Sequence, residues 1–214
     1  MRVIVVGAGR LGTQFAAVLT GAGNEVTLVD QDPAVLAAVT GTALVGDGCE
    51  PTVLEEAGAH AADMLVAATG EDEDNLVVSL LAKRQFGVAR VVARINDADN
   101  TWLFDDRWGV DVAVPSAAPL ISLMEEATGA LDTVALLRLG RAGVNVIETV
   151  IDEHSAAAGH PLGDVALPAG CVVAAVVRDG QPSVPGPAFM LRPGDELLVV
   201  AHSTTDTQVR SAFQ

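Results

Sequence analysis

The N-terminus contains the stretch that decides the fold, Arg2-Val3-Ile4-Val5-Val6-Gly7-Ala8-Gly9-Arg10-Leu11-Gly12. Its first five residues are predicted to form a buried strand, and its last six match the pattern Gly-x-Gly-x-x-Gly. That pattern is weak by itself. Here it follows a strand and opens the amphipathic run Leu11–Ala22, which is the context that dinucleotide-binding loops require. The stretch therefore predicts a pyrophosphate-binding turn at the start of a helix.

Each glycine of this loop has its own expected role. Gly7 permits a tight turn, Gly9 lacks the Cβ that would block a pyrophosphate, and Gly12 lets the helix pack closely on the strand. The helix that follows offers free N–H groups and a partial positive charge to a phosphate.

An acidic residue ends the second apolar run at the distance that this fold requires. Asp30 lies 18 positions after Gly12, where a carboxylate accepts hydrogen bonds from ribose hydroxyls. The same charge repels a 2′-phosphate, and no arginine follows it immediately. NAD or another adenosine nucleotide is therefore favoured over NADP.

Further candidates stand at the ends of the other predicted strands, because ligands bind beyond the carboxyl ends of parallel strands. Asp47 is interpreted either as a contact to adenine or ribose or as an ordinary turn residue, and Thr69 either as a neighbour of the cofactor or as a helix cap. Arg94 is expected to meet a phosphate or to pair with an acid such as Asp97. The acidic run Glu71–Asp74 is interpreted as helix capping and not as a metal site. The candidate cofactor-binding residues are Gly7, Ala8, Gly9, Arg10, Leu11, Gly12, Asp30, Gly46, Asp47, Ala68, Thr69 and Arg94.

The first part of the chain alternates short apolar runs with longer amphipathic ones. Predicted strands are Arg2–Val6, Glu25–Asp30, Thr42–Gly46, Asp63–Ala68, Arg90–Ile95 and Asp111–Val114. Predicted helices are Leu11–Ala22, Pro33–Val39, Pro51–Ala57, Asp72–Phe86, Ala98–Trp108 and Pro115–Thr128, three of them beginning at a proline. This alternation predicts an α/β fold, a Rossmann-like doubly wound parallel sheet.

The pattern changes after Gly129. Strands are expected at Asp132–Leu139, Val144–Asp152, Cys171–Arg178 and Glu196–Ala201, with a hairpin at Asp179-Gly180 and a last helix capped by Ser203 or Thr204. The expected domains are residues 1–130, a nucleotide-binding N-terminal domain, and residues 131–214, a small α+β C-terminal module.

Composition excludes several classes of protein. Half of the 214 residues are apolar, but no stretch without a charge exceeds 14 residues, so no membrane-spanning helix is expected and the chain is predicted not to insert directly into a membrane. The net charge of −16 disfavours binding to nucleic acid. Two distant cysteines argue against a zinc site. The chain has no tyrosine, which rules out the Tyr-x-x-x-Lys arrangement of one oxidoreductase class.

The sequence resembles a known family. The Gly-rich loop, Asp30, Gly46-Asp47-Gly48 and Ala93-Arg94-Ile95-Asn96 are similar to the N-terminal regulator-of-potassium-conductance domain of Trk/Ktr-type potassium uptake systems. Residues 131–214, with Arg192-Pro193-Gly194-Asp195-Glu196-Leu197, look like the C-terminal module of that family.

The resemblance implies a cytoplasmic regulatory subunit without catalysis, lying at the inner face of the membrane through its partner. Such a subunit binds NAD(H) or ATP/ADP, assembles as a homo-oligomer of dimers in a ring, and gates a potassium-translocating membrane protein. It also implies that Arg10 reaches the terminal phosphate of a nucleotide held by a neighbouring subunit. Some members have a Glu, associated with a bound cation, where this chain has Ser116, so no metal is expected there.

Two rival functions are considered. An NAD-dependent oxidoreductase requires an acid or base near its substrate, and the only His before residue 130 is His60. A redox-sensing transcription repressor requires a basic DNA-binding module, which this acidic chain does not offer.

Overall fold

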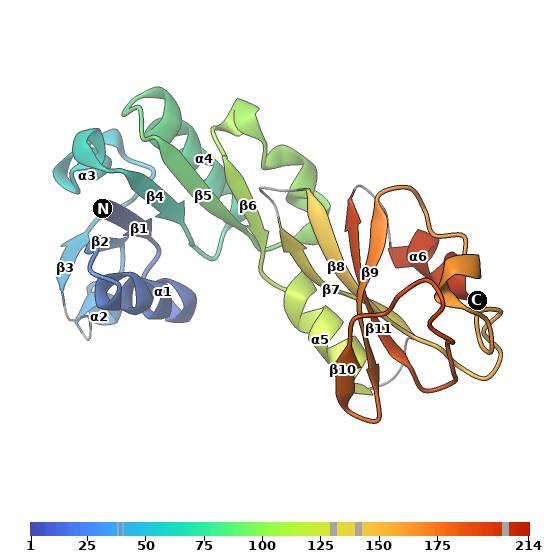
Figure 1. Ribbon diagram of the computed structural model, residues 1–214. Helices are drawn as coiled ribbons and strands as arrows, with labels where there is room; N and C mark the ends of the chain where they lie inside the picture. The colour runs from blue at the N-terminus through green and yellow to red at the C-terminus, as the bar shows by residue number, and fades with distance from the viewer. Residues whose placement is uncertain (38, 40, 129–131, 140–142, 203–205) are drawn as a thin grey trace. The chain divides into compact units, whose positions relative to one another are not determined.

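The computed structural model describes residues 1–37, 39, 41–128, 132–139, 143–202 and 206–214 (Figure 1). The chain divides into two compact units, Met1–Ala117 and Ala118–Gln214. The helix α5 (Ala118–Thr128) therefore belongs to the second unit by its contacts. The domain boundary expected between residues 130 and 131, and the expected helix cap at Ser203 or Thr204, lie outside the described residues.

The first unit contains a six-stranded parallel sheet in the order β3-β2-β1-β4-β5-β6. Its strands are β1 (Arg2–Val6), β2 (Glu25–Asp30), β3 (Thr42–Val45), β4 (Met64–Ala67), β5 (Arg90–Ile95) and β6 (Val112–Pro115). Its α-helices are α1 (Arg10–Gly21), α2 (Pro33–Leu36), α3 (Pro51–Glu56) and α4 (Asp72–Arg84). The predicted doubly wound sheet is confirmed, and its strand order reverses between β1 and β4.

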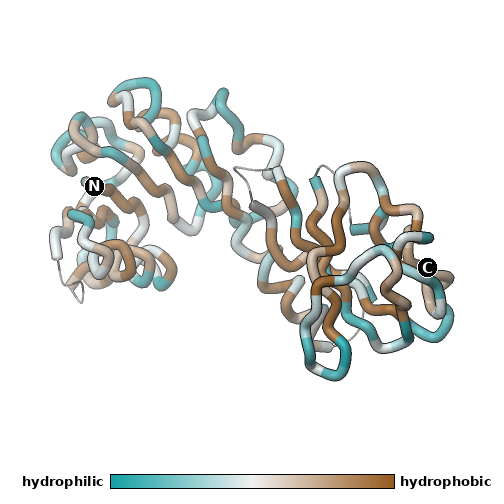
Figure 2. Tube along the Cα trace, in the orientation of Figure 1, coloured by the Kyte–Doolittle hydropathy of each residue, from teal (hydrophilic) through white to brown (hydrophobic). Residues whose placement is uncertain are grey.

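Burial explains why the central strands are continuously apolar. In β1, Val3, Ile4, Val5 and Val6 are all buried, because the residues pointing to opposite faces pack into two different clusters. Ile4 and Val6 join the larger cluster with Leu65 and Ile95, whereas Val3 and Val5 join the cluster that contains Ala16 of α1. Figure 2 shows the hydrophobic colour concentrated along the strands.

Three predicted helices differ from the structure. Residues 98–108 form two short 3₁₀ helices, Ala98–Leu103 and Asp106–Trp108, instead of one α-helix. The break has a local cause, because the Asp105 carboxylate accepts a hydrogen bond from the backbone N–H of Arg107 and competes with helical bonding. α2 is also shorter than expected and ends at Leu36.

Pro115 does not begin a helix as predicted. It is the last residue of β6, where it pairs with Ile95 of β5. β6 lies at the edge of the sheet, where a residue without an N–H is tolerated. The α5 helix begins three residues later, at Ala118.

The second unit contains a five-stranded antiparallel sheet in the order β10-β9-β11-β8-β7. Its strands are β7 (Thr133–Leu139), β8 (Val144–Val150), β9 (Cys171–Arg178), β10 (Gln181–Ser183) and β11 (Glu196–His202), and its second helix is α6 (Asp206–Phe213). The predicted hairpin turn between β9 and β10 is confirmed by positive φ angles at Asp179 and Gly180, 51° and 73°. The α+β character of this module is thus as expected.

One buried ion pair ties two segments of the second unit together. The Asp195 side chain is almost fully buried and accepts hydrogen bonds from Arg178 Nε and Nη2 at 2.6 and 2.7 Å. Burial raises the pKa of Asp195, but the hydrogen bonds from Arg178 and the Arg192 backbone outweigh that effect, so the pKa lies below its ordinary value. The guanidinium also lies 4.9 Å from the centre of the Phe189 ring.

None of the helices in the described residues combines the length and the apolar character that a membrane span requires.

Candidate nucleotide site

A crevice of about 430 Å³ lies beyond the carboxyl ends of the parallel strands in the first unit. It is located where the strand order reverses, between β1 and β4, which is the usual ligand position in open α/β sheets. Eight of the twelve candidate residues line it: Gly7, Gly9, Asp30, Gly46, Asp47, Ala68, Thr69 and Arg94.

The three glycines of the loop differ in what surrounds them. Gly7 has a φ of 99°, and a Cβ there would lie 2.7 Å from the backbone of Ala68. A Cβ on Gly12 would lie 1.9 Å from the carbonyl oxygen of Gly7, so Gly12 permits the close packing that was predicted. A Cβ on Gly9 would meet no atom within 4 Å. The space next to Gly9 is therefore open to a ligand.

Asp30 is hydrogen-bonded to the Gly-rich loop. Its Oδ2 accepts a hydrogen bond from the N–H of Ala8 at 2.6 Å, and its Oδ1 accepts one from the N–H of Asp32 at 2.9 Å. A carboxylate has about four acceptor positions, so two remain for other donors. Asp30 thus fixes the loop to the end of β2 and keeps capacity for hydroxyl groups.

Arg94 brings positive charge to an otherwise acidic crevice. Its Nε is buried and has no hydrogen-bond partner among the described residues. The ion pair with Asp97 considered from the sequence does not form between these two described residues. A buried donor without a partner costs roughly 1–3 kcal/mol, so an anion that accepts from this nitrogen would recover that free energy.

Asp47 and Thr69 both have local hydrogen bonds of their own. Asp47 accepts from the N–H of Cys49 at 2.8 Å, and the Thr69 hydroxyl contacts Glu71 and Asn75. Burial, followed by the charges of Asp74 and Asp47, raises the pKa of the Cys49 thiol to about 12. The thiol is therefore protonated at neutral pH and is a poor nucleophile.

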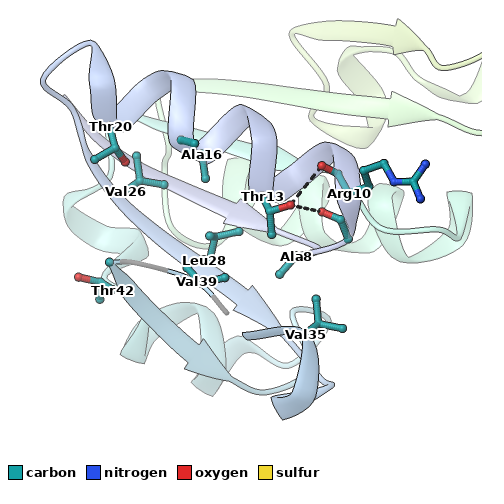
Figure 3. Close-up of a pocket in the computed structure, with 13 residues that line it drawn as sticks. Ala8, Arg10, Thr13, Ala16, Thr20, Val26, Leu28, Val35, Val39 and Thr42 are labelled. Carbon is teal, nitrogen blue, oxygen red and sulfur yellow. Dashed lines mark hydrogen bonds between the residues drawn. The ribbon is translucent and has the colours of Figure 1, made fainter. Parts of the chain in front are cut away.

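The other four candidate residues lie outside this crevice. Ala8 and Arg10 line a separate groove of about 690 Å³ between α1 and the strands β2 and β3, which Gly9 also borders (Figure 3). Leu28 and Val39 lie within this groove. Figure 3 shows that the Arg10 side chain, at one end of the groove, points away from them. Leu11 is half exposed on α1, and Gly12 is buried below the loop.

At the start of α4 the sequence analysis missed the buried Asn75 and assigned Asp72 to helix capping, whereas the N-cap residue Glu71 forms no side-chain capping bond. Asn75 is fully buried and connects Thr69 to the carbonyl of Arg94. Asp72 accepts hydrogen bonds from the backbone of Asn96 and Asp97, and these bonds, together with one from Asn100, hold its pKa below the ordinary value despite burial. The signal that was available is the acidic run Glu71–Asp74, whose second member, Asp72, falls on the buried face of the helix.

No group of three His, Cys, Asp or Glu in the described ranges is arranged to hold a metal ion. Three acidic residues of the crevice, Asp30, Asp32 and Asp47, instead accept hydrogen bonds from backbone N–H groups. Asp32 caps α2 by accepting from the N–H of Ala34.

Comparison with known proteins assigns both parts of the chain. Residues 3–116 match the TrkA-N domain family, and residues 146–213 match the TrkA-C domain family. The Trk system potassium uptake protein TrkA of Mycobacterium tuberculosis is 38% identical over 212 residues, which cover 98% of this chain and 96% of that protein. The chain belongs to the TrkA family. This confirms the resemblance seen in the sequence.

One more distant TrkA relative is matched over nearly its whole length. A TrkA homolog of Methanothermobacter thermautotrophicus is 29% identical over 217 residues, covering all of this chain and 99% of that protein.

Solved structures share the fold at lower identity. The RCK domain of GsuK superposes with a TM-score of 0.56 at 22% identity over 99% of this chain. The GsuK channel bound to NAD gives a TM-score of 0.54, also at 22% identity and over 98% of this chain. The chain spans less than half of each of these two GsuK chains, 46% and 38%.

Proposed function

We propose that this chain is a nucleotide-sensing regulatory subunit that gates a potassium-translocating membrane protein. The observation that carries the proposal is the crevice at the β1/β4 reversal, which is lined by Gly9, with open space beside it, and by Arg94, whose buried Nε has no partner among the described residues. Its membership of a family of potassium uptake proteins supports the regulatory role. The subunit acts in the cytoplasm, at the inner face of the membrane through its partner.

The ligand of the crevice is NAD(H) or ATP/ADP. The pyrophosphate lies against the loop at Gly9, and the free Nε of Arg94 donates to a phosphate oxygen. Asp30 accepts from ribose hydroxyls with its remaining lone pairs, and its charge disfavours a 2′-phosphate. A related channel, GsuK, has been solved with bound NAD, which supports this choice of ligand.

The subunits form a homo-oligomer in which dimers assemble into a ring. Regulation requires that this ring adopt two conformations that bind the nucleotide with different affinity. The ligand then shifts the population toward one shape, and that change is transmitted to the membrane partner. Arg10 extends away from its own groove and forms no ion pair or side-chain hydrogen bond among the described residues. This position suits a contact to the nucleotide of a neighbouring subunit.

The alternative is an NAD-dependent oxidoreductase. Its acid or base would have to stand in the crevice, and the lining that the structure describes contains no His or Lys. Lys83 is bonded to Asp111 and to the carbonyl of Ala89 instead. The Cys49 thiol, with a pKa of about 12, is not a base at neutral pH. These observations favour a chain without catalysis.

The test is a thermal-shift panel of NAD, NADH, ATP, ADP and NADPH on the full chain, with hydride transfer followed in the same samples. Stabilisation by the first four nucleotides and none by NADPH is expected, with no hydride transfer. Absence of stabilisation by every nucleotide overturns the proposal, and turnover of NAD with a small substrate supports the enzyme.

A further inference from the structure

Asn75 stands behind the crevice and does not line it. It lies in the first turn of α4, with a side chain that is 0% exposed. The neighbouring α4 residues Asp74 and Val78 line the crevice, whereas Asn75 is directed into the protein between the ends of β4 and β5. A fully buried amide in such a position requires partners for both its donor and its acceptor.

The Asn75 amide has those partners on two neighbouring strands. Its Oδ1 accepts from the N–H and the hydroxyl of Thr69, both at 2.9 Å. Its Nδ2 donates to the carbonyl of Arg94 at 3.1 Å and to that of Thr69 at 3.4 Å. An N–H can only donate and a carbonyl can only accept, so the orientation of the amide is chemically determined. Neither an aspartate nor an aliphatic side chain can form this set of bonds.

These bonds fix the backbone of two residues that face the crevice. Arg94 is held at its carbonyl by Asn75, and the backbone N–H groups of Asn96 and Asp97, two and three residues later, are held at 2.7 and 3.0 Å by Asp72. The backbone is therefore anchored at Arg94 itself and again within three residues after it. Arg94 lines the crevice, and the buried Nε of its side chain is left without a partner among the described residues.

We propose that Asn75 is a positioning residue that fixes Arg94, and through it sets how strongly the crevice prefers a ligand with more phosphate. The inference rests on the proposed function, because it concerns the same crevice. Phosphate geometry is satisfied only when the guanidinium is held in place. Loss of Asn75 should therefore affect the phosphate-dependent part of affinity and spare the nucleoside part.

The experiment compares adenosine, AMP and ADP by calorimetric titration of the full chain. Asn75→Asp keeps the size of the side chain but turns an acceptor toward the Arg94 and Thr69 carbonyls. We expect it to lower the affinity ratio of ADP to adenosine by about tenfold, the loss typical of a weakened charged hydrogen bond, with adenosine affinity unchanged. Ser79→Ala is the matched control, because Ser79 is equally buried on α4 and bonds only to the Asn75 carbonyl, at 2.6 Å. It should leave the ratio unchanged.

A double-mutant cycle with Arg94→Gln separates positioning from general destabilisation. In that background Asn75→Asp should lower the ratio no further. Equal losses for adenosine and ADP, or losses that add to those of Arg94→Gln, overturn the inference. If Asn75→Asp does not fold, Asn75→Ser serves instead, because its short side chain cannot span Thr69 and Arg94. Nucleotide binding with an unchanged ratio in these variants contradicts only the inference, whereas a wild-type chain that binds none of the ligands overturns the proposed function with it.

Discussion

The backbone N–H of Ala8, inside the Gly-rich loop, donates a 2.6 Å hydrogen bond to the carboxylate of Asp30 at the end of the next strand. The residue expected to select the ribose therefore also holds the phosphate-binding loop in place. Loop geometry and ligand selection are thus coupled through one side chain, and changes at Asp30 should affect both.

Asp30→Ala should weaken binding of NAD(H) or ATP by about 1–3 kcal/mol, because a charged acceptor is lost from the ribose and from Ala8. Calorimetry gives the affinity. The matched control is Asp63→Ala, since Asp63 accepts from the N–H of Arg2 at 2.7 Å at the amino ends of β1 and β4, away from the crevice. Equal effects on binding from the two variants would show that Asp30 has no specific role.

Gly12→Ala should destabilise the chain by about 1–3 kcal/mol, because the added Cβ would lie 1.9 Å from the carbonyl oxygen of Gly7. Gly21→Ala is the control on the same helix, because a Cβ there meets nothing within 4 Å and should raise stability by up to about 1 kcal/mol. Urea unfolding measures both. Equal stability of the two variants would contradict the close approach of helix and loop.

Asp195→Asn should destabilise the second unit at neutral pH, by about 1–3 kcal/mol, because Arg178 loses a charged partner. The lower part of that range is expected, since 29% of the Arg178 side chain is exposed to solvent. Arg107→Ala is the control. It removes the far more exposed ion pair with Asp105 and should change the free energy of unfolding little.

The same pair predicts a pH dependence. Because folding lowers the pKa of Asp195, its contribution to stability is present above its ordinary pKa of 3.8 and is lost as the pH falls through the lower folded value. Urea unfolding of wild type between pH 5 and pH 2 should therefore show a loss of stability that Asp195→Asn lacks. If the stability of the two proteins fell equally with pH, Asp195 would have no such role in the acid range.

Arg10→Ala should reduce the difference in affinity between ATP and ADP, or between NADH and NAD, and weaken nucleotide-dependent assembly. Affinity for adenosine should change little, because Arg10 does not line the crevice in which the nucleotide is proposed to bind. Titrations with light scattering in parallel provide the measurement. Identical nucleotide discrimination in wild type and variant would eliminate a contact across subunits.

Sequence patterns could predict the parallel sheet and most of the crevice because these depend on local signals. The Gly-rich loop, the acid at the end of β2 and the apolar strands can each be recognised from a few consecutive residues. The bond from Ala8 to Asp30 and the role of Asn75 could not be read in this way, because they join residues 19 to 22 positions apart through the packed fold. Periodicity also could not reveal the break at Asp105, where one side chain outcompetes helical hydrogen bonding.

Calorimetric titration of the full chain and of Gly9→Val with NAD, NADH, ATP and ADP tests nucleotide binding at this crevice most directly. A Cβ at position 9 meets no described protein atom within 4 Å, so we expect the variant to fold, with its side chain in the space expected for the pyrophosphate. Binding by wild type and none by Gly9→Val, with equal thermal stability of the two proteins without ligand, is the predicted result. Equal nucleotide affinity in both proteins would contradict the assignment of the crevice.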